Sequence, residues 1–352
     1  MESIVTAGDT VLLKPNLFQE KTYQTGAITN PAVIHATVRL VKEAGAKRVV
    51  VAEGAAVGHD TKEAFASSGV AEMQNQGVEL VDFKNGESAW VVNPCARLFK
   101  RLRVPKCFLE SNVVVNFPVM KTHDAVPATL GLKNMKGIIH ETDKKRFHKW
   151  GLEQGIVDLN HIALPELTIL DATIGMEGFG PVSGDPVNLG IVMASTDTVA
   201  LDAGAARVMG MNPQEINYLQ MAGRAGLGCT DPQYIEVVGC EVAEVCRPFN
   251  RISLSQGDYD RYGLRVIEEG ACSGCSHFLE TVAAKLIKNN DIQKLSGYTI
   301  VYGQTAEPPE NVRDTNLITI GTCMRRHKHR GRYMPGCPPH PHDFEDRILS
   351  KL

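Results

Sequence analysis

The 352-residue chain lacks the features that mark membrane, repeat and nucleic-acid-binding proteins. No run reaches the ~18–20 apolar residues that a membrane helix needs, and the N-terminus lacks the pattern of a signal peptide. The formal net charge is only −3, and no basic stripe with interleaved aromatic residues is present. We therefore expect a cytoplasmic protein with no membrane span and no nucleic-acid partner.

A disulfide framework is also not expected. The nine cysteines are odd in number and occur without a secretory signal, so they are predicted to be reduced thiols or metal ligands. A hydrophobic content of 43% with 22% charged residues is typical of a globular protein. The length is sufficient for two domains, each with its own core.

Four cysteines gather in the last quarter of the chain. Cys272 and Cys275 form a C-x2-C pair, whereas Cys323 and Cys337 occur singly. Zinc sites usually present two short pairs, so ligands that arrive singly favour a larger iron–sulfur cluster. Pro338 follows the last cysteine, as in the C-P ending of ferredoxin motifs. We predict one 4Fe-4S cluster on these four cysteines, with zinc as the lesser alternative and ordinary thiols as the third.

Apolar runs alternate with helical patterns throughout residues 1–248. Strands are expected at residues 10–15, 48–52, 78–82, 113–117, 167–171, 189–194 and 234–238. Helices are expected between them, one of them with Asn30 as its N-cap and Pro31 at its first position. This alternation predicts an α/β domain with a largely parallel sheet and helices on both faces.

The composition changes near residue 249, and the cysteine-rich part follows. A helix is expected at residues 279–288, and strands at residues 299–302 and 317–320. Residues 249–352 are therefore predicted to form a smaller α/β domain that binds the cluster.

Polar residues follow several predicted strands of the first domain. In a parallel sheet, ligands bind beyond the carboxyl ends of the strands. Lysine ammonium groups with amide donors beside them suit phosphate or carboxylate. The predicted set for a small anionic substrate or cofactor is Lys14, Asn16, Lys121, Lys133, Asn134 and Lys136. For any single lysine, the alternative is a solvated position on the surface.

Acid–base chemistry has three candidates. His123 closely follows Lys121 and can supply a proton, and Asp171 and Glu177 can orient the histidine or accept a proton. Four glycines within residues 175–184 indicate either an anion-binding backbone loop or a tight connection without a ligand. A second metal site is left open at Cys229, Cys240 and Cys246.

Five motifs in order resemble the domain-of-unknown-function family numbered 362. They are Leu13-Lys-Pro-Asn-Leu17, Pro118-Val-Met-Lys-Thr-His123, Gly131-Leu-Lys-Asn-Met-Lys-Gly137, the segment 171–181 and the segment 196–203. The resemblance spans residues ~9–212 and implies an α/β architecture with a pocket, without naming a reaction. The family is widespread in anaerobic bacteria and archaea, and many members carry iron–sulfur ligands.

The cysteine segment has a local resemblance of its own. Residues 335–339, Pro-Gly-Cys-Pro-Pro, are similar to a segment of the cluster-bearing small subunit of NADH dehydrogenases and nickel–iron hydrogenases. Members of family 362 often carry a C-x2-C-x2-C-x3-C-P run, from which the dispersed pattern here departs. The resemblance therefore leaves the number and type of clusters open, and we predict one.

The combined expectation is an iron–sulfur protein of anaerobic metabolism, an oxidoreductase or electron-transfer protein that acts on a small anionic substrate or cofactor. Ligation by four cysteines leaves no open iron, which favours electron transfer. The alternatives are a lyase or isomerase with an open cluster iron, and a protein that delivers metal or electrons to a larger enzyme. A redox partner protein and a homo-oligomer are further possibilities.

Overall fold

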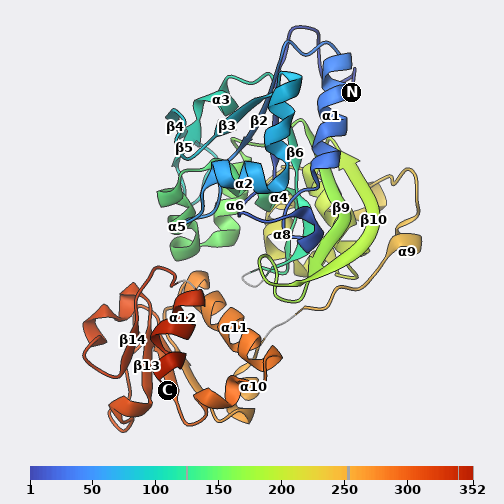
Figure 1. Cartoon of the computed structure of the whole chain (residues 1–352). Coiled ribbons are helices and arrows are strands. Elements are labelled where there is room, and N and C mark those ends of the chain that lie inside the picture. The colour runs from blue at the N-terminus through green and yellow to red at the C-terminus, as the bar shows by residue number, and fades with distance from the viewer. Residues whose placement is uncertain (124–125, 252–253, 340, 352) are drawn as a thin grey trace. The chain divides into compact units, whose positions relative to one another are not determined.

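The structure is a computed structural model that describes residues 1–123, 126–251, 254–339 and 341–351. The chain divides into two compact units. The larger unit comprises residues 1–147 and 151–251, and the smaller comprises residues 148–150 and 252–352. Each unit has its own sheet (Figure 1). Each also has its own hydrophobic core.

A largely parallel sheet forms the centre of the larger unit. Its strands are β1 (Thr10–Pro15), β2 (Arg48–Glu53), β3 (Glu79–Asp82), β6 (Val113–Phe117), β7 (Val119–Thr122), β8 (Ala128–Thr129), β9 (Leu167–Glu177) and β10 (Asp185–Ser195). The order is β3-β2-β1-β6-β9-β7-β8, with β10 paired to β9. The short β8 and the long β10 run antiparallel to their partners, whereas the other pairs are parallel. The predicted α/β class with a largely parallel sheet is confirmed.

Helices cover both faces of this sheet. They are α1 (Pro31–Glu43), α2 (Thr61–Ser68), α6 (Leu152–Asn160), α7 (Thr198–Val208) and α8 (Asn217–Arg224). Successive side chains of a strand point to opposite faces. Leu12 of β1 accordingly packs in a core with α6, α7 and α8, whereas Val11 and Leu13 pack with α1 and α2. Each fully buried leucine contributes about 2–3 kcal/mol.

Shorter elements complete the larger unit, except that the last three residues of α5, 148–150, group with the smaller unit. They are β4 (Ser88–Val92), β5 (Arg101–Pro105), α3 (Lys106–Leu109), α4 (Gly131–Asn134), α5 (Glu141–Trp150), α9 (Val242–Val245) and the 3-10 turns Tyr23–Thr25, Val70–Gln76, Met135–Ile138, Pro213–Glu215 and Pro232–Tyr234. β4 and β5 form an antiparallel hairpin of their own.

Local chemistry sets the limits of α1. Asn30 Oδ1 accepts a hydrogen bond from the backbone N–H of Ala32 at 3.0 Å, and Pro31 occupies the first turn. Gly45 follows the helix with φ 95°, a conformation that glycine adopts without strain. The predicted start of this helix is confirmed.

The strand predicted at residues 234–238 is wrong. The segment begins with the 3-10 turn Pro232–Tyr234 and then continues without strand pairing. Tyr234 is 80% exposed and Val238 is 87% exposed. A high β propensity is therefore not sufficient here, because strand residues are stabilised by packing against cross-strand neighbours that this segment lacks.

The smaller unit is built on a parallel sheet. Its strands, in spatial order, are β11 (Arg265–Glu268), β12 (Thr299–Tyr302), β13 (Leu317–Ile320) and β14 (Arg332–Met334). Its helices and turns are α10 (Gln256–Arg261), α11 (Ser273–Lys288), α12 (Pro341–Arg347), Ile292–Leu295, Asp314–Asn316, Thr322–His327 and Leu349–Lys351. The rings of Phe278 and Phe344 lie 5.9 Å apart and join α11 to α12 in the core. The strands predicted at 299–302 and 317–320 are confirmed, and the helix predicted from residue 279 begins earlier, at Ser273.

Candidate anion-binding pocket and cysteine cluster

A pocket lies at the carboxyl edge of the larger sheet. The chain runs from β1 outward through β2 and β3, and then returns to β6 on the other side of β1. Ligands of open α/β sheets bind at such a reversal of strand order, because the loops diverge there. Lys14 of β1 and Asn116 of β6 are register partners at this point.

Lysines dominate the lining of the pocket. The lining residues are Asn16, Phe18, Glu53, Gly54, Ala56, Lys121, Thr129, Lys133, Asn134, Lys136, Gly137, Lys144 and Pro181. Five of the six predicted anion-binding residues are in this set, and the sixth, Lys14, contacts Glu53. The volume of about 160 Å³ corresponds to roughly five waters at ~30 Å³ each. Among the lining residues that the structure describes, Glu53 is the single carboxylate.

Lys14 and Glu53 form a buried ion pair beneath the pocket. Lys14 Nζ donates to Glu53 Oε2 and to the carbonyl of Pro15, at 2.9 Å each. The backbone N–H groups of Gly54 and Leu17 also donate to the Glu53 carboxylate. Burial lowers the pKa of Lys14, and Glu53 opposes that shift. The negative charge of Glu53 is thus already engaged, and the pair adds little net charge.

Lys121 of β7 has no carboxylate partner among its hydrogen bonds in the described residues. Its Nζ donates to the carbonyl of Ala27 at 2.7 Å and to Asn16 Oδ1 at 3.4 Å, and it lies 4.3 Å from the centre of the Phe18 ring. Burial, followed by the neighbouring charge of Lys133, lowers the pKa of Lys121 well below 10.5. Lys121 is therefore a desolvated amine held by carbonyl oxygens.

Lys144 of α5 was not predicted from the sequence. Its Nζ donates to the carbonyl of Gly54 at 2.7 Å, and burial lowers its pKa to about 8. Gly54 lies close to this group, whereas Gly137 lies close to the ion pair of Lys14 and Glu53. A Cβ on Gly137 would lie 2.4 Å from Glu53 Oε1, so a side chain there is incompatible with the pocket.

Side-chain hydrogen bonds to two residues, Asn116 and Asp202, hold the helix α4, which carries Lys133 and Asn134. Asn134 Nδ2 donates to Asn116 Oδ1 of β6 at 2.7 Å. Asp202 of α7 accepts from the backbone N–H groups of Gly131 at 2.6 Å and Leu132 at 3.0 Å. Burial raises the pKa of Asp202 to about 7, although these two bonds act against the rise. Asp202 therefore ties the lysine-bearing segment to α7.

The three acid–base candidates do not line the pocket. Asp171 is buried, and it accepts hydrogen bonds from the backbone of Asn30 and from Thr173. Glu177 forms a bidentate ion pair with Arg247, which lowers the pKa of the carboxyl. His123 follows β7 and is partly buried. Asp171 and Glu177 thus connect elements of the fold, and the catalytic assignment of the three residues stays a prediction.

The glycine-rich segment 175–184 joins β9 to β10. A Cβ on Gly180 would lie 2.1 Å from the carbonyl oxygen of Thr122, and one on Gly184 would lie 2.2 Å from that of Glu177. Close approach to other backbone therefore accounts for these glycines, as in the tight-connection alternative. The segment contributes Pro181 to the pocket lining.

The four predicted ligand cysteines follow strand ends of the smaller unit. Cys272 caps α11 after β11, Cys275 lies in the first turn of α11, Cys323 follows β13 and Cys337 follows β14. A hydrogen bond from the Cys275 thiol lowers the pKa of Cys272 to about 5, and the backbone N–H groups of Cys275 and Gly274 add to this effect. The other three cysteines all raise the pKa of Cys275. The other three thiols thus lie within electrostatic range of Cys275.

The surroundings of these thiols suit a soft metal. A Cβ on Gly321 would lie 3.0 Å from Cys275 Sγ, which is a tight contact, and the φ of 93° at this position favours glycine. Across residues 1–123, 126–251, 254–339 and 341–351, however, no three His, Cys, Asp or Glu side chains converge closely enough to hold one metal ion. The cluster therefore stays a prediction, supported by the donor set and by the lowered pKa of Cys272.

A second metal site at the other three cysteines has no further support. Cys229 Sγ donates to the carbonyl of Asp231, and Cys246 Sγ donates to that of Arg207. Cys240 and Cys246 are exposed.

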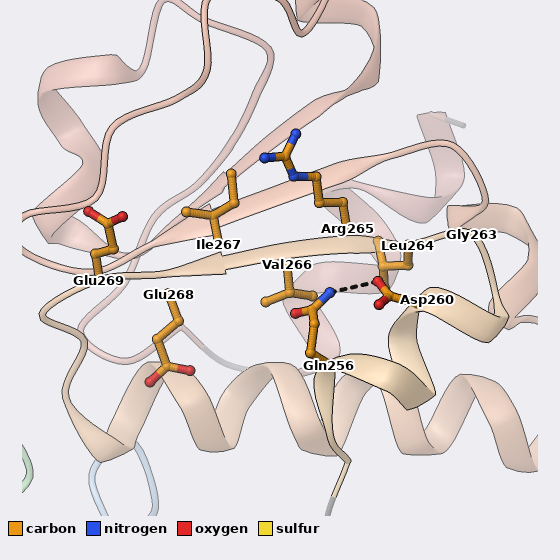
Figure 2. Close-up of a pocket in the computed structure, with 9 residues that line it drawn as sticks. All are labelled: Gln256, Asp260, Gly263, Leu264, Arg265, Val266, Ile267, Glu268 and Glu269. Atoms are coloured by element: carbon orange, nitrogen blue, oxygen red, sulfur yellow. Dashed lines mark hydrogen bonds between the residues drawn. The ribbon is translucent and has the colours of Figure 1, made fainter.

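A larger hollow of about 640 Å³ follows the outer edge of β11 (Figure 2). Arg265, Ile267 and Glu269 point to one side of the strand, and Val266 and Glu268 point to the other. The lining carries charges of both signs and none of the predicted site residues. The hollow therefore has no preference for an anion.

The predicted anion-binding set leaves out three residues of the lysine pocket and its support. Glu53 ends a buried strand, and the strand-end rule that selected Lys14 also applies to it. Asp202 lies within the motif 196–203, which indicated the family but no role. Lys144 lies in a polar helical stretch, and no local pattern distinguishes it from a surface lysine.

Fold and pocket together define a two-unit α/β protein with a lysine-lined pocket at the edge of its larger sheet and four cysteines in its smaller unit. The chain belongs to the family described as a domain of unknown function (DUF362), whose model matches residues 11–207. That match ends before the four predicted ligand cysteines, so the likeness of residues 335–339 to hydrogenase and NADH dehydrogenase subunits stays a prediction.

Known proteins resemble the chain to different degrees. A thylakoid-associated protein of Synechocystis sp. is 29% identical over 297 residues, which cover 76% of this chain and 88% of that protein. The lactate racemase apoprotein of Thermoanaerobacterium thermosaccharolyticum has a TM-score of 0.41 at 16% identity over 59% of this chain, and a Thermotoga maritima protein has 0.38 at 12% over 63%. The chain spans about half the length of these two structures, 50% and 56%. No described helix is long and apolar enough to cross a membrane.

Proposed function

We propose that the larger unit binds a small anionic substrate or cofactor in the lysine-lined pocket. The observation that carries this proposal is the composition of the lining, in which the described residues include the lysines Lys133, Lys136 and Lys144 beside one carboxylate, Glu53. Glu53 is itself paired with Lys14. Buried charges need compensation, so a pocket with excess cationic groups is stabilised by an anion.

The size of the pocket limits the ligand. A volume of about 160 Å³ lies well below the ~300–1,000 Å³ of sites for drug-sized ligands. A nucleotide is too large to be enclosed, whereas phosphate or a short carboxylic acid fits. Asn16 and Asn134 add amide groups that can bind the oxygens of such an anion.

Calorimetric titration with inorganic phosphate and with pyruvate, at constant ionic strength set by chloride, tests this function. The Lys133→Met variant keeps most of the side-chain volume and removes the charge, so binding is expected to weaken roughly tenfold, which is 1.4 kcal/mol. The matched control is Lys62→Met on the exposed surface of α2. Equal affinities in the two variants, or no binding by the wild type, would overturn the proposal.

For the smaller unit, we propose one 4Fe-4S cluster on Cys272, Cys275, Cys323 and Cys337, with zinc as the alternative. The lowered pKa of Cys272 favours a thiolate, which is the form that binds metal. A bound cluster supplies one-electron transfer, so an oxidoreductase or electron-transfer role in the cytoplasm with a redox partner is the proposed activity. Metal delivery, or lyase or isomerase chemistry at an open iron, is the second proposal.

Metal content decides between these proposals. Protein purified without oxygen is expected to contain about four irons and four sulfides per chain and to lose colour with dithionite. Single Cys→Ser variants then separate the roles. Loss of the cluster in all four variants supports electron transfer, whereas an intact cluster in one variant supports an open iron. One zinc per chain without colour would refute the redox activity.

A further inference from the structure

We propose that Lys121 forms a Schiff base with the carbonyl carbon of a small 2-oxo acid, whose carboxylate is bound by the neighbouring lysines. This inference rests on the proposed anion-binding function and names the substrate class of that pocket. One lysine thus has a covalent role, in addition to the role of the neighbouring lysines in binding the anion.

The contacts of Lys121 differ from those of Lys14 beneath the pocket, whereas Lys144 resembles Lys121 in donating to backbone carbonyls, those of Gly54 and Ala55. Lys14 pairs with a carboxylate, whereas Lys121 Nζ has the carbonyl of Ala27 and the amide oxygen of Asn16 as its hydrogen-bond acceptors. Neither acceptor carries the negative charge that would stabilise an ammonium ion. The side chain is 1% exposed, yet it lines the pocket.

Burial in such a place favours a neutral amine. Desolvation is the largest effect on Lys121, and the charges of Lys133, Lys21 and Lys14 act in the same direction. Lysines that are desolvated and lie beside other cations act as nucleophiles, because the unprotonated amine has a free electron pair. A neutral amine does not form an ion pair with a bound anion. The position of Lys121 among cationic groups therefore suits it to form a covalent bond.

The other lysines supply the carboxylate site. The pKa of Lys144 is about 8, so this side chain is mostly cationic at neutral pH, and its Nζ is held toward the pocket by the carbonyl of Gly54. Space for roughly five waters fits an acid of three or four carbons. A carbonyl beside the carboxylate places the electrophilic carbon next to the anion site.

The reaction balances without a further reagent. The amine nitrogen attacks the carbonyl carbon, and a carbon–nitrogen bond forms while the carbonyl oxygen becomes a hydroxyl group. The hydroxyl then leaves as water, and both amine protons depart with the oxygen to give the neutral imine. No atom is oxidised or reduced, and a proton taken up afterwards gives the iminium ion.

Reductive trapping on the full chain tests this step. The protein is incubated near neutral pH with pyruvate and cyanoborohydride, and the adduct is located by peptide mass spectrometry. Each unit by which the pKa is lowered raises the neutral fraction tenfold, so modification of Lys121 should exceed that of exposed Lys62 by at least about tenfold. Inorganic phosphate should suppress the adduct at Lys121 and leave Lys62 unaffected.

Variants and competing outcomes complete the test. Lys121→Arg should lose the adduct, whereas Lys62→Arg, the matched control, should keep the adduct at Lys121. Because the adduct is mapped in wild-type protein, a variant that fails to fold does not decide the result. Phosphate binding without an adduct at Lys121, or adducts spread evenly over exposed lysines, would refute the Schiff base and leave the anion site intact. Absence of both phosphate binding and adduct would refute both proposals.

Discussion

Replacement of Asp202 by asparagine should change the pH dependence of stability in a specific direction. Asp202 is fully buried on α7 and accepts the backbone N–H groups of Gly131 and Leu132 at the start of α4. Burial raises its pKa from 3.8 to about 7. Between these two values the unfolded chain is ionised at this position, whereas the folded protein keeps the proton.

The raised pKa sets both the sign and the size of the effect. The folded state binds the additional proton, so the contribution of Asp202 to stability is greatest below about pH 4, falls as the pH rises to about 7 and is constant above that. A rise of about three units corresponds to roughly 4 kcal/mol at ~1.4 kcal/mol per unit. Asparagine does not titrate, so Asp202→Asn should remove the loss of stability that Asp202 causes as the pH rises from about 4 to about 7.

Urea unfolding near pH 5 and near pH 8 measures the effect. Near pH 5 the variant should be about 1–2 kcal/mol less stable than the wild type, because the amide has one carbonyl oxygen for two backbone donors. Between these pH values, ionisation of Asp202 lowers the free energy of unfolding of the wild type by about 3 kcal/mol. Near pH 8 the variant should therefore be about 1–2 kcal/mol more stable than the wild type.

A difference between variant and wild type that is the same at both pH values would refute the reasoning. Asp158→Asn provides a comparison at a second fully buried carboxylate, which accepts the backbone N–H groups of Arg97, Leu98 and Phe99. Loss of these charge-assisted bonds should destabilise the protein by about 2–3 kcal/mol near pH 8, where Asp202→Asn should not.

Three further predictions concern the two sites. Phosphate binding measured by calorimetry should weaken as the pH rises through about 8, because Lys144 then loses its charge, and Lys144→Met should weaken binding and remove this step. Glu53→Gln should lower the free energy of unfolding by roughly 3 kcal/mol, since Lys14 loses its buried partner, yet tighten phosphate binding; weaker binding would contradict the assigned charge balance. Cys275→Ser should abolish iron binding, whereas Cys95→Ser at an exposed thiol should not; equal iron in both would exclude Cys275 as a ligand.

Much of the fold could be predicted because its elements are determined locally. The buried strand Thr10–Pro15 is a continuous apolar run, and α1 begins where Asn30 and Pro31 provide a cap and a first turn. The segment 234–238 has the same apolar, β-branched character but no neighbour to pair with. Local sequence therefore predicts the tendency to form a strand, while pairing depends on the rest of the chain.

The sequence by itself determined the lysine and asparagine candidates, since the carboxyl ends of parallel strands meet at one edge of the sheet. Only the tertiary structure decided which of these side chains are paired with a carboxylate and which are buried without one. It paired Lys14 with Glu53, left Lys121 among carbonyl oxygens and brought Lys144 from a polar helix to the same pocket. It also engaged Asp171 and Glu177 in structural contacts away from the pocket lining. The physical reason is that burial and charge pairing depend on side chains distant in the sequence, which no local pattern contains.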